Sequence, residues 1–260
     1  AWGRGAHGAL GVESTEDALA PVRVAGLGDP PEPAAAAPRE KVTSIAAADH
    51  SLAITERGAA YAWGLGTDGQ LGLGDRASHR RPQRIGGVLL KATAVAASAG
   101  WRHTLILASG GEVYSFGRGA AGQLGHGGRD DAAAPRAIDA LRGARVVQVA
   151  AGGEHSAFLT ADGEVLTCGS GAAGCLGQGG TAPSPLPRAM SDTSGSGFGR
   201  DSIAAVAAGL MHTVAVTSVG RVLACGSNAA LQLGRPQQAF ASTPRLVFGV
   251  QARAVAPGRR

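Results

Sequence analysis

The sequence predicts an all-β fold, a β-propeller of four-stranded antiparallel blades that recur about every 52 residues. Three observations support this prediction. The chain holds 42 glycines and 13 prolines among 260 residues, so turns are frequent. No long stretch has the apolar spacing of an amphipathic helix. Finally, histidines recur at nearly constant separations of 53, 52 and 57 residues, at His50, His103, His155 and His212.

Each of these histidines begins a stretch of constant spacing. In the third copy, His155 is followed by Gly163, Gly169 and the pair Leu176-Gly177, at intervals of eight, six and eight residues. The same intervals occur in all four copies. The distance from a Leu-Gly pair to the next histidine varies instead, from 30 to 39 residues when a partial copy ending at Gly11 is included. A constant core with variable joints indicates that each copy is one supersecondary unit.

The chemistry of one copy predicts its strands in order. Residues 156–160 and 164–168 flank Asp162-Gly163, a dipeptide favoured in tight hairpin turns. A further strand precedes each histidine, and a fourth, weaker strand lies at a proline after the Leu-Gly pair. The expected first strands are 44–47, 93–97, 146–151 and 205–208, and the expected fourth strands are 82–85, 135–138 and 244–247. Four antiparallel strands in each copy are typical of a propeller blade.

The copies share more than their spacing. Their motifs include Val-Ala-Ala-Gly-Gly-Glu-His-Ser at 149–156, Asp162-Gly163, Cys168-Gly169, Leu176-Gly177, Trp63-Gly64 and Gly-Gln-Leu-Gly at 69–72. Together these motifs resemble the regulator-of-chromosome-condensation repeat, over nearly the whole chain. The resemblance implies a seven-bladed propeller that strands from both ends of the chain close into a ring.

The expected organisation is a single partial propeller over residues 1–260. Its segments are a partial repeat at 1–40, repeats at 41–91, 92–143, 144–200 and 201–249, and the start of a further repeat at 250–260. Seven repeats would need about 360 residues. We therefore expect an incomplete part of a seven-bladed ring, with a closed five-bladed ring as the alternative. Insertions at 29–38 and 191–199 lengthen two of the joints.

The charge pattern limits the classes of partner. The net charge is +5 and the isoelectric point is about 9.7, but the basic residues are scattered and only Lys41 and Lys91 are lysines. A nucleic-acid surface would cluster them, so we do not expect a nucleic-acid partner. No run of about 18 apolar residues occurs, so we do not expect a membrane partner. Three cysteines are too few for a disulfide framework and favour an intracellular compartment, which we do not specify further.

Two repeated motifs suggest small-molecule or metal sites. Gly-x-Gly-x-x-Gly occurs at 3–8, 64–69, 117–122 and 169–174, but without the following helix that a dinucleotide site requires. Equivalent histidines in successive blades should lie around a ring, not around one ion. We expect each imidazole to hydrogen-bond backbone near its own strand. We therefore predict no catalytic residues, no cofactor and no metal site.

The three cysteines occupy two kinds of position. Cys168 and Cys225 stand where other copies have Trp63 and Phe116, so we expect them to fill the core. Cys175 stands in the Leu-Gly loop, where other copies have glutamine, and we expect it to be the thiol that is exposed to solvent.

The two residues before each histidine vary while their surroundings repeat. They are Ala48-Asp49, Trp101-Arg102, Gly153-Glu154 and Leu210-Met211. Variable turn positions on a repeated scaffold encode the choice of partner in many proteins. Trp and Arg are frequent interaction hot spots, and Met makes adaptable contacts. We predict a partner-binding face that includes Trp101, Arg102, Leu210 and Met211 together with Asp49 and Glu154. The alternative is that Trp101 only packs over the top of its blade.

The predicted function is a non-enzymatic protein–protein interaction platform, a scaffold or accessory subunit of a larger assembly. A propeller offers broad faces and rigid loops for protein partners, whose identity the sequence does not state. The family resemblance implies two alternatives, nucleotide exchange on a small GTPase and substrate recognition for a ubiquitin ligase. The family that the chain resembles also includes a plant ultraviolet-B receptor with clustered tryptophans. Trp101 has no tryptophan at the matching positions of the other copies, so we do not expect photoreception.

Overall fold

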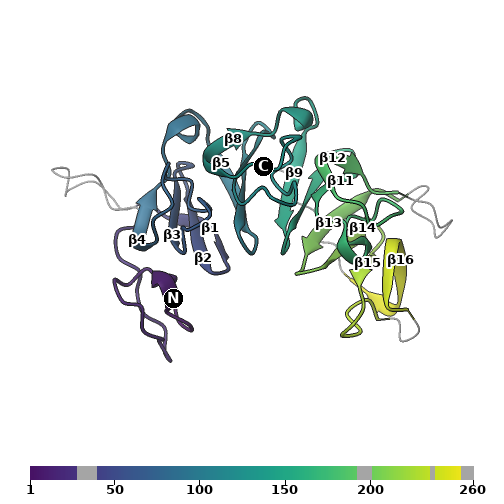
Figure 1. The fold of residues 1–260 in the computed structure, drawn as a ribbon, viewed down its shortest axis with the longest axis horizontal. Coiled ribbons are helices and arrows are strands. Elements are labelled where there is room, and N and C mark those ends of the chain that lie inside the picture. The colour runs from purple at the N-terminus through teal and green to yellow at the C-terminus, as the bar shows by residue number, and fades with distance from the viewer. Residues whose placement is uncertain (28–39, 192–200, 235–237, 253–260) are drawn as a thin grey trace. The chain divides into compact units, whose positions relative to one another are not determined.

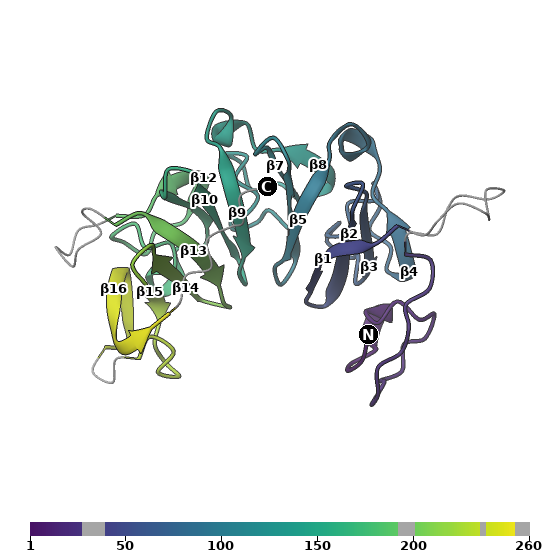
Figure 2. The same cartoon turned by 180° about the vertical axis from the view of Figure 1, so that it is seen from behind.

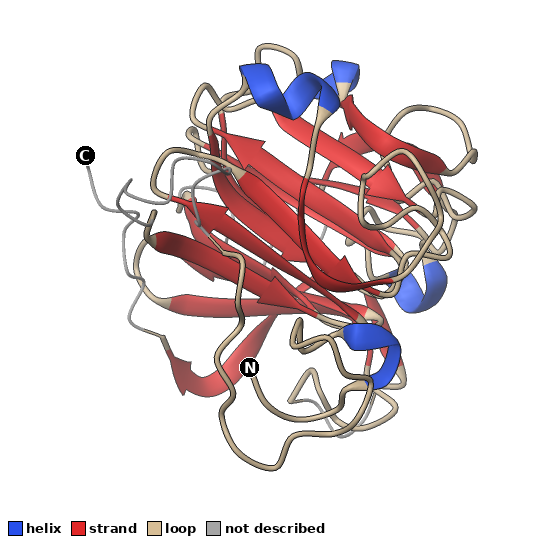
Figure 3. Cartoon of the chain, turned by 90° about the vertical axis from the view of Figure 1, so that its left-hand side faces the viewer, coloured by secondary structure: helices blue, strands red, loops and turns tan. Residues whose placement is uncertain are grey.

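A computed structural model describes residues 1–27, 40–191, 201–234 and 238–252 of the chain. Within these ranges the fold consists of four sheets of four antiparallel strands each. Strands dominate Figure 3, and the helical segments are short turns. This confirms the all-β prediction and the four-stranded antiparallel blade. The insertion at 29–38 and nearly all of that at 191–199 lie outside the described residues, as does the end of the chain from 253.

The described chain falls into two compact units. The first comprises Ala1–Arg118 and Asp131–Ala137, and the second comprises Gly119–Asp130 and the chain from Ile138. Each unit holds two complete blades. That the four blades belong to one ring, and that the ring is incomplete, stays a prediction.

The first unit contains two sheets whose strands lie side by side in sequence order (Figures 1 and 2). The strands of the first sheet are β1 (Val42–Ala47), β2 (His50–Thr55), β3 (Ala60–Gly64) and β4 (His79–Arg84). The strands of the second are β5 (Ala94–Ala99), β6 (His103–Ala108), β7 (Val113–Gly117) and β8 (Ala132–Ala137). Segment 1–27 carries one isolated bridge, between Gly3 and Ala18, and packs against β3 and β4 through its single helical turn, η1 (Ala6–Gly8).

The second unit repeats the arrangement. Its first sheet contains β9 (Val146–Ala151), β10 (His155–Thr160), β11 (Val165–Gly169) and β12 (Ser184–Ala189). Its second contains β13 (Ile203–Ala208), β14 (His212–Thr217), β15 (Arg221–Ser227) and β16 (Phe240–Gln251). The remaining 3-10 turns are η2 (Gly87–Lys91), η3 (Asp139–Leu141) and η4 (Ala172–Gly174). No helix among the described residues is both long enough and apolar enough to cross a membrane.

The repeated glycines have a steric reason. In all four blades the histidine that begins the second strand pairs with a glycine at or next to the end of the third, as His155 pairs with Gly169. Gly169 has φ +110°, which side-chain-bearing residues rarely adopt. A β-carbon there would also lie 2.5 Å from the Glu154 carbonyl oxygen and 2.7 Å from the His155 Cα. The site therefore requires glycine because of both its backbone conformation and its lack of space.

The hydrophobic core lies on the second and third strands of each blade. Every residue of β2, β6 and β10 is buried, whereas the outer strands β4, β8 and β12 are mostly exposed or half-buried. In the first unit the core includes Leu52, Ile54, Ile106 and Phe116. Burying one such side chain contributes roughly 1.5–3 kcal/mol. The turns at the ends of the second strand are thereby mounted on the most firmly packed element of the blade.

Candidate functional site

The repeated histidines link neighbouring copies through hydroxyl groups. The Nε2 atom of His50 lies 2.7 Å from the Thr104 Oγ1, which donates to the Gln70 carbonyl at 2.7 Å. In the second unit, His155 Nε2 lies 2.9 Å from Thr213 Oγ1, which donates to a carbonyl in the same way. Because the hydroxyl proton is already donated, each hydroxyl must accept from the imidazole, and Nε2 carries the hydrogen.

This geometry corrects one expectation. The imidazoles of His50 and His155 do not hydrogen-bond backbone near their own strand, because their Nε2 atoms reach the threonine of the next copy instead. A sequence signal was present, since a serine or threonine follows every repeated histidine: Ser51, Thr104, Ser156 and Thr213. The pattern joins one copy to the next, so its meaning depends on how the copies pack.

Burial keeps the imidazoles of His50 and His155 uncharged. Desolvation lowers the pKa of His50 to about 4, and desolvation together with the nearby His212 lowers the pKa of His155 to about 4. The described residues include no cluster of three histidine, cysteine or acidic side chains that could hold a metal ion. The described glycine-rich loop at 64–69 connects β3 to β4, so it lacks the strand-to-helix context of a dinucleotide site. The imidazoles of His50 and His155 link neighbouring copies through buried hydrogen bonds.

The cysteines follow the sequence prediction in two cases out of three. Cys168 and Cys225 are fully buried, as expected of core residues. The expectation that Cys175 is exposed was wrong, because it is buried and its Sγ donates to the Ser170 carbonyl oxygen at 3.0 Å. Burial raises the pKa of Cys175 to about 12. The Leu-Gly loop turns this position inward in other copies too, since Gln70 and Gln123 are also buried.

The predicted interface residues all lie in the turn between the first and second strands of a blade. The first unit contains Asp49, Trp101 and Arg102. The second unit contains Glu154, Leu210 and Met211. Trp101, Leu210 and Met211 are 46%, 64% and 40% exposed, and Asp49 is exposed as well. The following paragraphs describe which residues of the set, Arg102 and Glu154 included, lie close together within each unit. A continuous face across the four blades stays a prediction.

Arg102 organises the turn that carries Trp101. Its Cζ lies 5.5 Å from the centre of the Trp101 ring, a cation–π distance worth roughly 0.5–1 kcal/mol at an exposed site. Its Nη1 lies 2.9 Å from Asp68 Oδ2 and donates to Thr67 Oγ1 at 3.4 Å. Its carbonyl oxygen accepts from the Arg118 N–H at 2.8 Å. The guanidinium is therefore held at several points, and the exposed indole rests on a fixed support.

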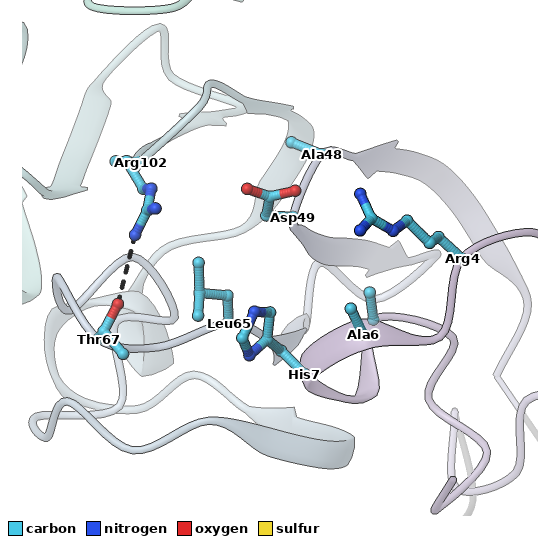
Figure 4. Close-up of a pocket in the computed structure, with 9 residues that line it drawn as sticks. Arg4, Ala6, His7, Ala48, Asp49, Leu65, Thr67 and Arg102 are labelled. Atoms are coloured by element: carbon cyan, nitrogen blue, oxygen red, sulfur yellow. Dashed lines mark hydrogen bonds between the residues drawn. The ribbon is translucent and has the colours of Figure 1, made fainter. Parts of the chain in front are cut away.

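Next to this turn lies a pocket of about 400 Å³ (Figure 4). Its polar lining comes from Arg4, His7, Asp49, Thr67 and Arg102. Its apolar lining comes from Ala6, Ala9, Ala48 and Leu65. In Figure 4 the Arg4 side chain extends toward Asp49, and Arg102 lies on the other side of Asp49 with its guanidinium directed to Thr67. The structure thus brings two of the predicted residues, Asp49 and Arg102, to one cavity.

The sequence reading missed Arg4, His7 and Thr67. All three belong to the Gly-x-Gly-x-x-Gly loops at 3–8 and 64–69. The glycine pattern of these loops suggests a nucleotide motif and does not point to their other side chains. Aligning the copies shows what could have been noticed. His7 occupies the position of Asp68, just as Asp49 occupies that of Arg102. The variable loop residues and the variable turn residues of consecutive copies therefore face one another.

Family models confirm the repeat. The model described as the regulator of chromosome condensation (RCC1) repeat matches residues 57–107, 110–159 and 162–216. A second RCC1 repeat model matches residues 42–70, 94–123 and 146–175. The chain belongs to the RCC1 repeat family. The histidine-to-threonine contacts described above are thus contacts between RCC1 repeats.

Curated relatives of this RCC1-repeat chain include a photoreceptor and a ligase. The ultraviolet-B receptor UVR8 of Arabidopsis thaliana is 33% identical over 252 residues, which cover 95% of this chain and 52% of the receptor. The human E3 ubiquitin-protein ligase HERC2 is 32% identical over 257 residues, which cover 98% of this chain and 5% of the ligase. The chain therefore spans about half of one relative and a small part of the other.

Solved structures agree on the fold. Human WBSCR16 superposes with a TM-score of 0.78 at 24% identity, over 94% of this chain and 60% of that protein. Prp20p of Saccharomyces cerevisiae superposes with a TM-score of 0.68 at 24% identity, over 81% of this chain and 51% of that protein. These likenesses support RCC1-type propeller blades and carry no more than the fold.

Proposed function

We propose that this RCC1-repeat chain is a non-enzymatic protein-binding platform, a scaffold or accessory subunit of a larger assembly. We further propose that Trp101 and Arg102 make its principal contact in the first unit. The observation that supports this most directly is the 46% exposed indole of Trp101 on a turn that Arg102 and Asp68 hold in place.

The physical argument concerns the cost of binding. A flexible apolar side chain loses rotamer freedom when a partner covers it, at roughly 0.5–1.5 kcal/mol for each side chain immobilised. Trp101 is stacked beforehand on Arg102, whose guanidinium is itself hydrogen-bonded to Asp68. Little ordering remains to be done on binding, so the apolar area of the indole contributes to affinity. A tryptophan that served only blade packing would not need this exposure.

The second unit offers a candidate contact of the same kind. Leu210 and Met211 form an exposed apolar pair at the equivalent turn, between β13 and β14. The turn is anchored by its backbone, since the Met211 carbonyl accepts from the Ser227 N–H at 2.8 Å and the Leu210 carbonyl accepts from the Gly153 N–H at 3.2 Å. We propose this pair as a second partner contact.

The relatives favour protein partners over a reaction carried out by the blades. Prp20p has been described with binding properties toward Gsp1p and histones, and HERC2 is an E3 ubiquitin-protein ligase. Exchange on a small GTPase and substrate recognition for a ubiquitin ligase are therefore the alternatives to a scaffold. All three roles need a protein-binding surface. Exchange on a small GTPase also requires nucleotide release from the partner.

The test compares partner recovery for three forms of the protein. Affinity purification with quantitative mass spectrometry is run on wild type, on the double variant Trp101→Ala and Arg102→Ala, and on Trp2→Ala. Trp2 is a matched control because it is a 67% exposed tryptophan in the same unit. Loss of a hot-spot contact of 2 kcal/mol or more corresponds to an affinity loss of roughly thirtyfold.

The expected result is that specific proteins disappear from the double variant and remain with Trp2→Ala. Titration calorimetry with the purified partner then measures the loss directly. Nucleotide release from fluorescently loaded small GTPases, with and without the chain, separates exchange from scaffolding. Equal recovery by wild type and by a double variant of unchanged melting temperature contradicts the proposed contact.

A further inference from the structure

The pocket beside Trp101 contains two charged side chains that the fold does not use. Arg4 and Asp49 both line it and both are exposed. Neither side chain makes a hydrogen bond or ion pair with another described residue. Arg102 differs, because its charge is matched by Asp68 at 2.9 Å. Yet the Arg102 Nε is buried and has no hydrogen-bond partner among the described residues.

The balance of donors and acceptors indicates what the pocket would take. Arg4 presents five side-chain N–H donors, and none of them is paired with an acceptor of another described residue. The only charged acceptor in the lining is the Asp49 carboxylate. Donors therefore exceed acceptors, and a ligand that supplies acceptors completes the site. A carboxylate does this best for arginine, because its two oxygens match the guanidinium fork.

The same charges favour one carboxylate over a phosphate. Arg4 is the one arginine of the lining without an ion pair to a described residue, and Asp49 lies in the same cavity. A singly charged carboxylate can bind Arg4 with modest repulsion from Asp49. A phosphate monoester carries close to two negative charges and would meet that repulsion in greater measure. Asp49 thus selects against multiply charged groups.

We propose that this pocket binds the carboxylate of an aspartate or glutamate in a partner protein, with an apolar residue beside it packing on Trp101. The inference rests on the proposed protein-binding function and names the chemistry of the partner. Arg102 joins the two halves of the site, since it lines the pocket and also stacks on the indole. The recognised element is a short acidic segment with an aromatic or aliphatic neighbour.

Two substitutions predict opposite effects. Arg4→Gln removes the free guanidinium, and affinity for an acidic peptide should fall roughly tenfold, as for loss of a charge-assisted hydrogen bond. Asp49→Asn removes the repelling carboxylate, and affinity should rise roughly threefold, in line with partly exposed charge pairs. Arg4 and Asp49 are exposed, and their side chains make no hydrogen bond or ion pair with another described residue. Both variants should therefore fold. Arg57→Gln is the matched control, because Arg57 is an exposed arginine beyond the opposite end of β2.

The experiment selects a phage-displayed library of random twelve-residue peptides on the purified chain. Fluorescence polarisation then measures the affinity of an enriched peptide for wild type, Arg4→Gln, Asp49→Asn, Trp101→Ala and Arg57→Gln. The same peptide with its acidic residue changed to the amide tests the ligand side. The proposal expects an acidic residue beside an apolar one, weaker binding to Arg4→Gln and Trp101→Ala, and stronger binding to Asp49→Asn. It also expects that the amide peptide no longer distinguishes Arg4→Gln from wild type.

The outcomes separate this inference from the proposed function. Enriched peptides that need Trp101 but contain no acidic residue, or that bind Arg4→Gln as tightly as wild type, overturn the carboxylate site and leave the protein-binding function standing. Enrichment of no peptide, together with no partner in the affinity purification above, overturns both. Equal loss of affinity in Arg57→Gln also overturns the site, because it would show a general charge effect.

Discussion

The imidazole of His50 lies 2.7 Å from the hydroxyl of Thr104, a residue 54 positions later that is the second residue of the corresponding strand in the next blade. The hydroxyl continues the chain of hydrogen bonds to the Gln70 carbonyl. All three groups are buried, and the imidazole is neutral. One buried network therefore joins two repeats. All four copies have the residue types that it uses, a histidine followed by a side chain with a hydroxyl group.

Thr104→Val tests this network. Valine keeps the shape of threonine but leaves the His50 N–H and the Gln70 carbonyl without partners in a buried site. We expect the free energy of unfolding to fall by roughly 2–4 kcal/mol, the cost of unsatisfied buried groups. Urea denaturation measures it. Thr15→Val, at an exposed position of the same unit, should change stability by less than about 0.5 kcal/mol. Equal stability of both variants would show that the network contributes nothing.

Stability should depend on pH because two imidazoles are buried uncharged. The pKa of His50 and of His155 is about 4 in the folded chain and about 6.5 when exposed. Between these values the unfolded chain binds protons that the folded chain does not. The free energy of unfolding therefore falls as pH is lowered from 6.5 to 4, by at most roughly 3 kcal/mol for each histidine.

Urea titrations at several pH values between 7.5 and 4 measure this dependence. His50→Gln keeps an N–H donor without a titrating group, so its curve should be flatter than that of wild type by one histidine's share. A wild-type stability that stays level from pH 7 to pH 4 would show that the imidazoles are accessible to protons.

Gly169→Ala should be strongly destabilising. The φ of +110° is strained for alanine, and the added carbon would overlap the Glu154 carbonyl and the backbone of His155. The expected loss is roughly 2–4 kcal/mol, by analogy with other strained backbone positions. Gly180→Ala is the control from the same unit, because its β-carbon would meet open space. Thermal melting compares the two, and a Gly169→Ala variant as stable as Gly180→Ala would refute the steric argument.

The three thiols should be unreactive until the chain unfolds. Cys168, Cys175 and Cys225 are all free and buried, and burial raises the pKa of each. A chromogenic disulfide reagent at pH 8 should label none of them rapidly in the folded chain and all three in denaturant. Rapid labelling of one thiol in Cys168→Ala and Cys225→Ala backgrounds would show that Cys175 is accessible after all.

Much of the fold was predictable because it depends on neighbours in the sequence. The Asp162-Gly163 hairpin and the strand spacing are local properties, and repetition made them visible four times over. The exposed turn position of Trp101 was predictable for the same reason. The partner of His50 was not, because it belongs to another copy. Cys175 was misplaced because other copies have glutamine at its position in the Leu-Gly loop, whereas its side chain is buried.

The β architecture, the glycines that its turns require and the positions where copies differ are therefore all visible in the sequence. Which of those differing positions meet depends on the packing of the folded chain. Arg4 and Arg102 are 98 residues apart, yet they line one pocket with Asp49. The physical reason is that hairpins and turns arise from short-range backbone preferences. A shared cavity depends instead on how separately formed sheets pack against each other, which no single stretch of sequence encodes.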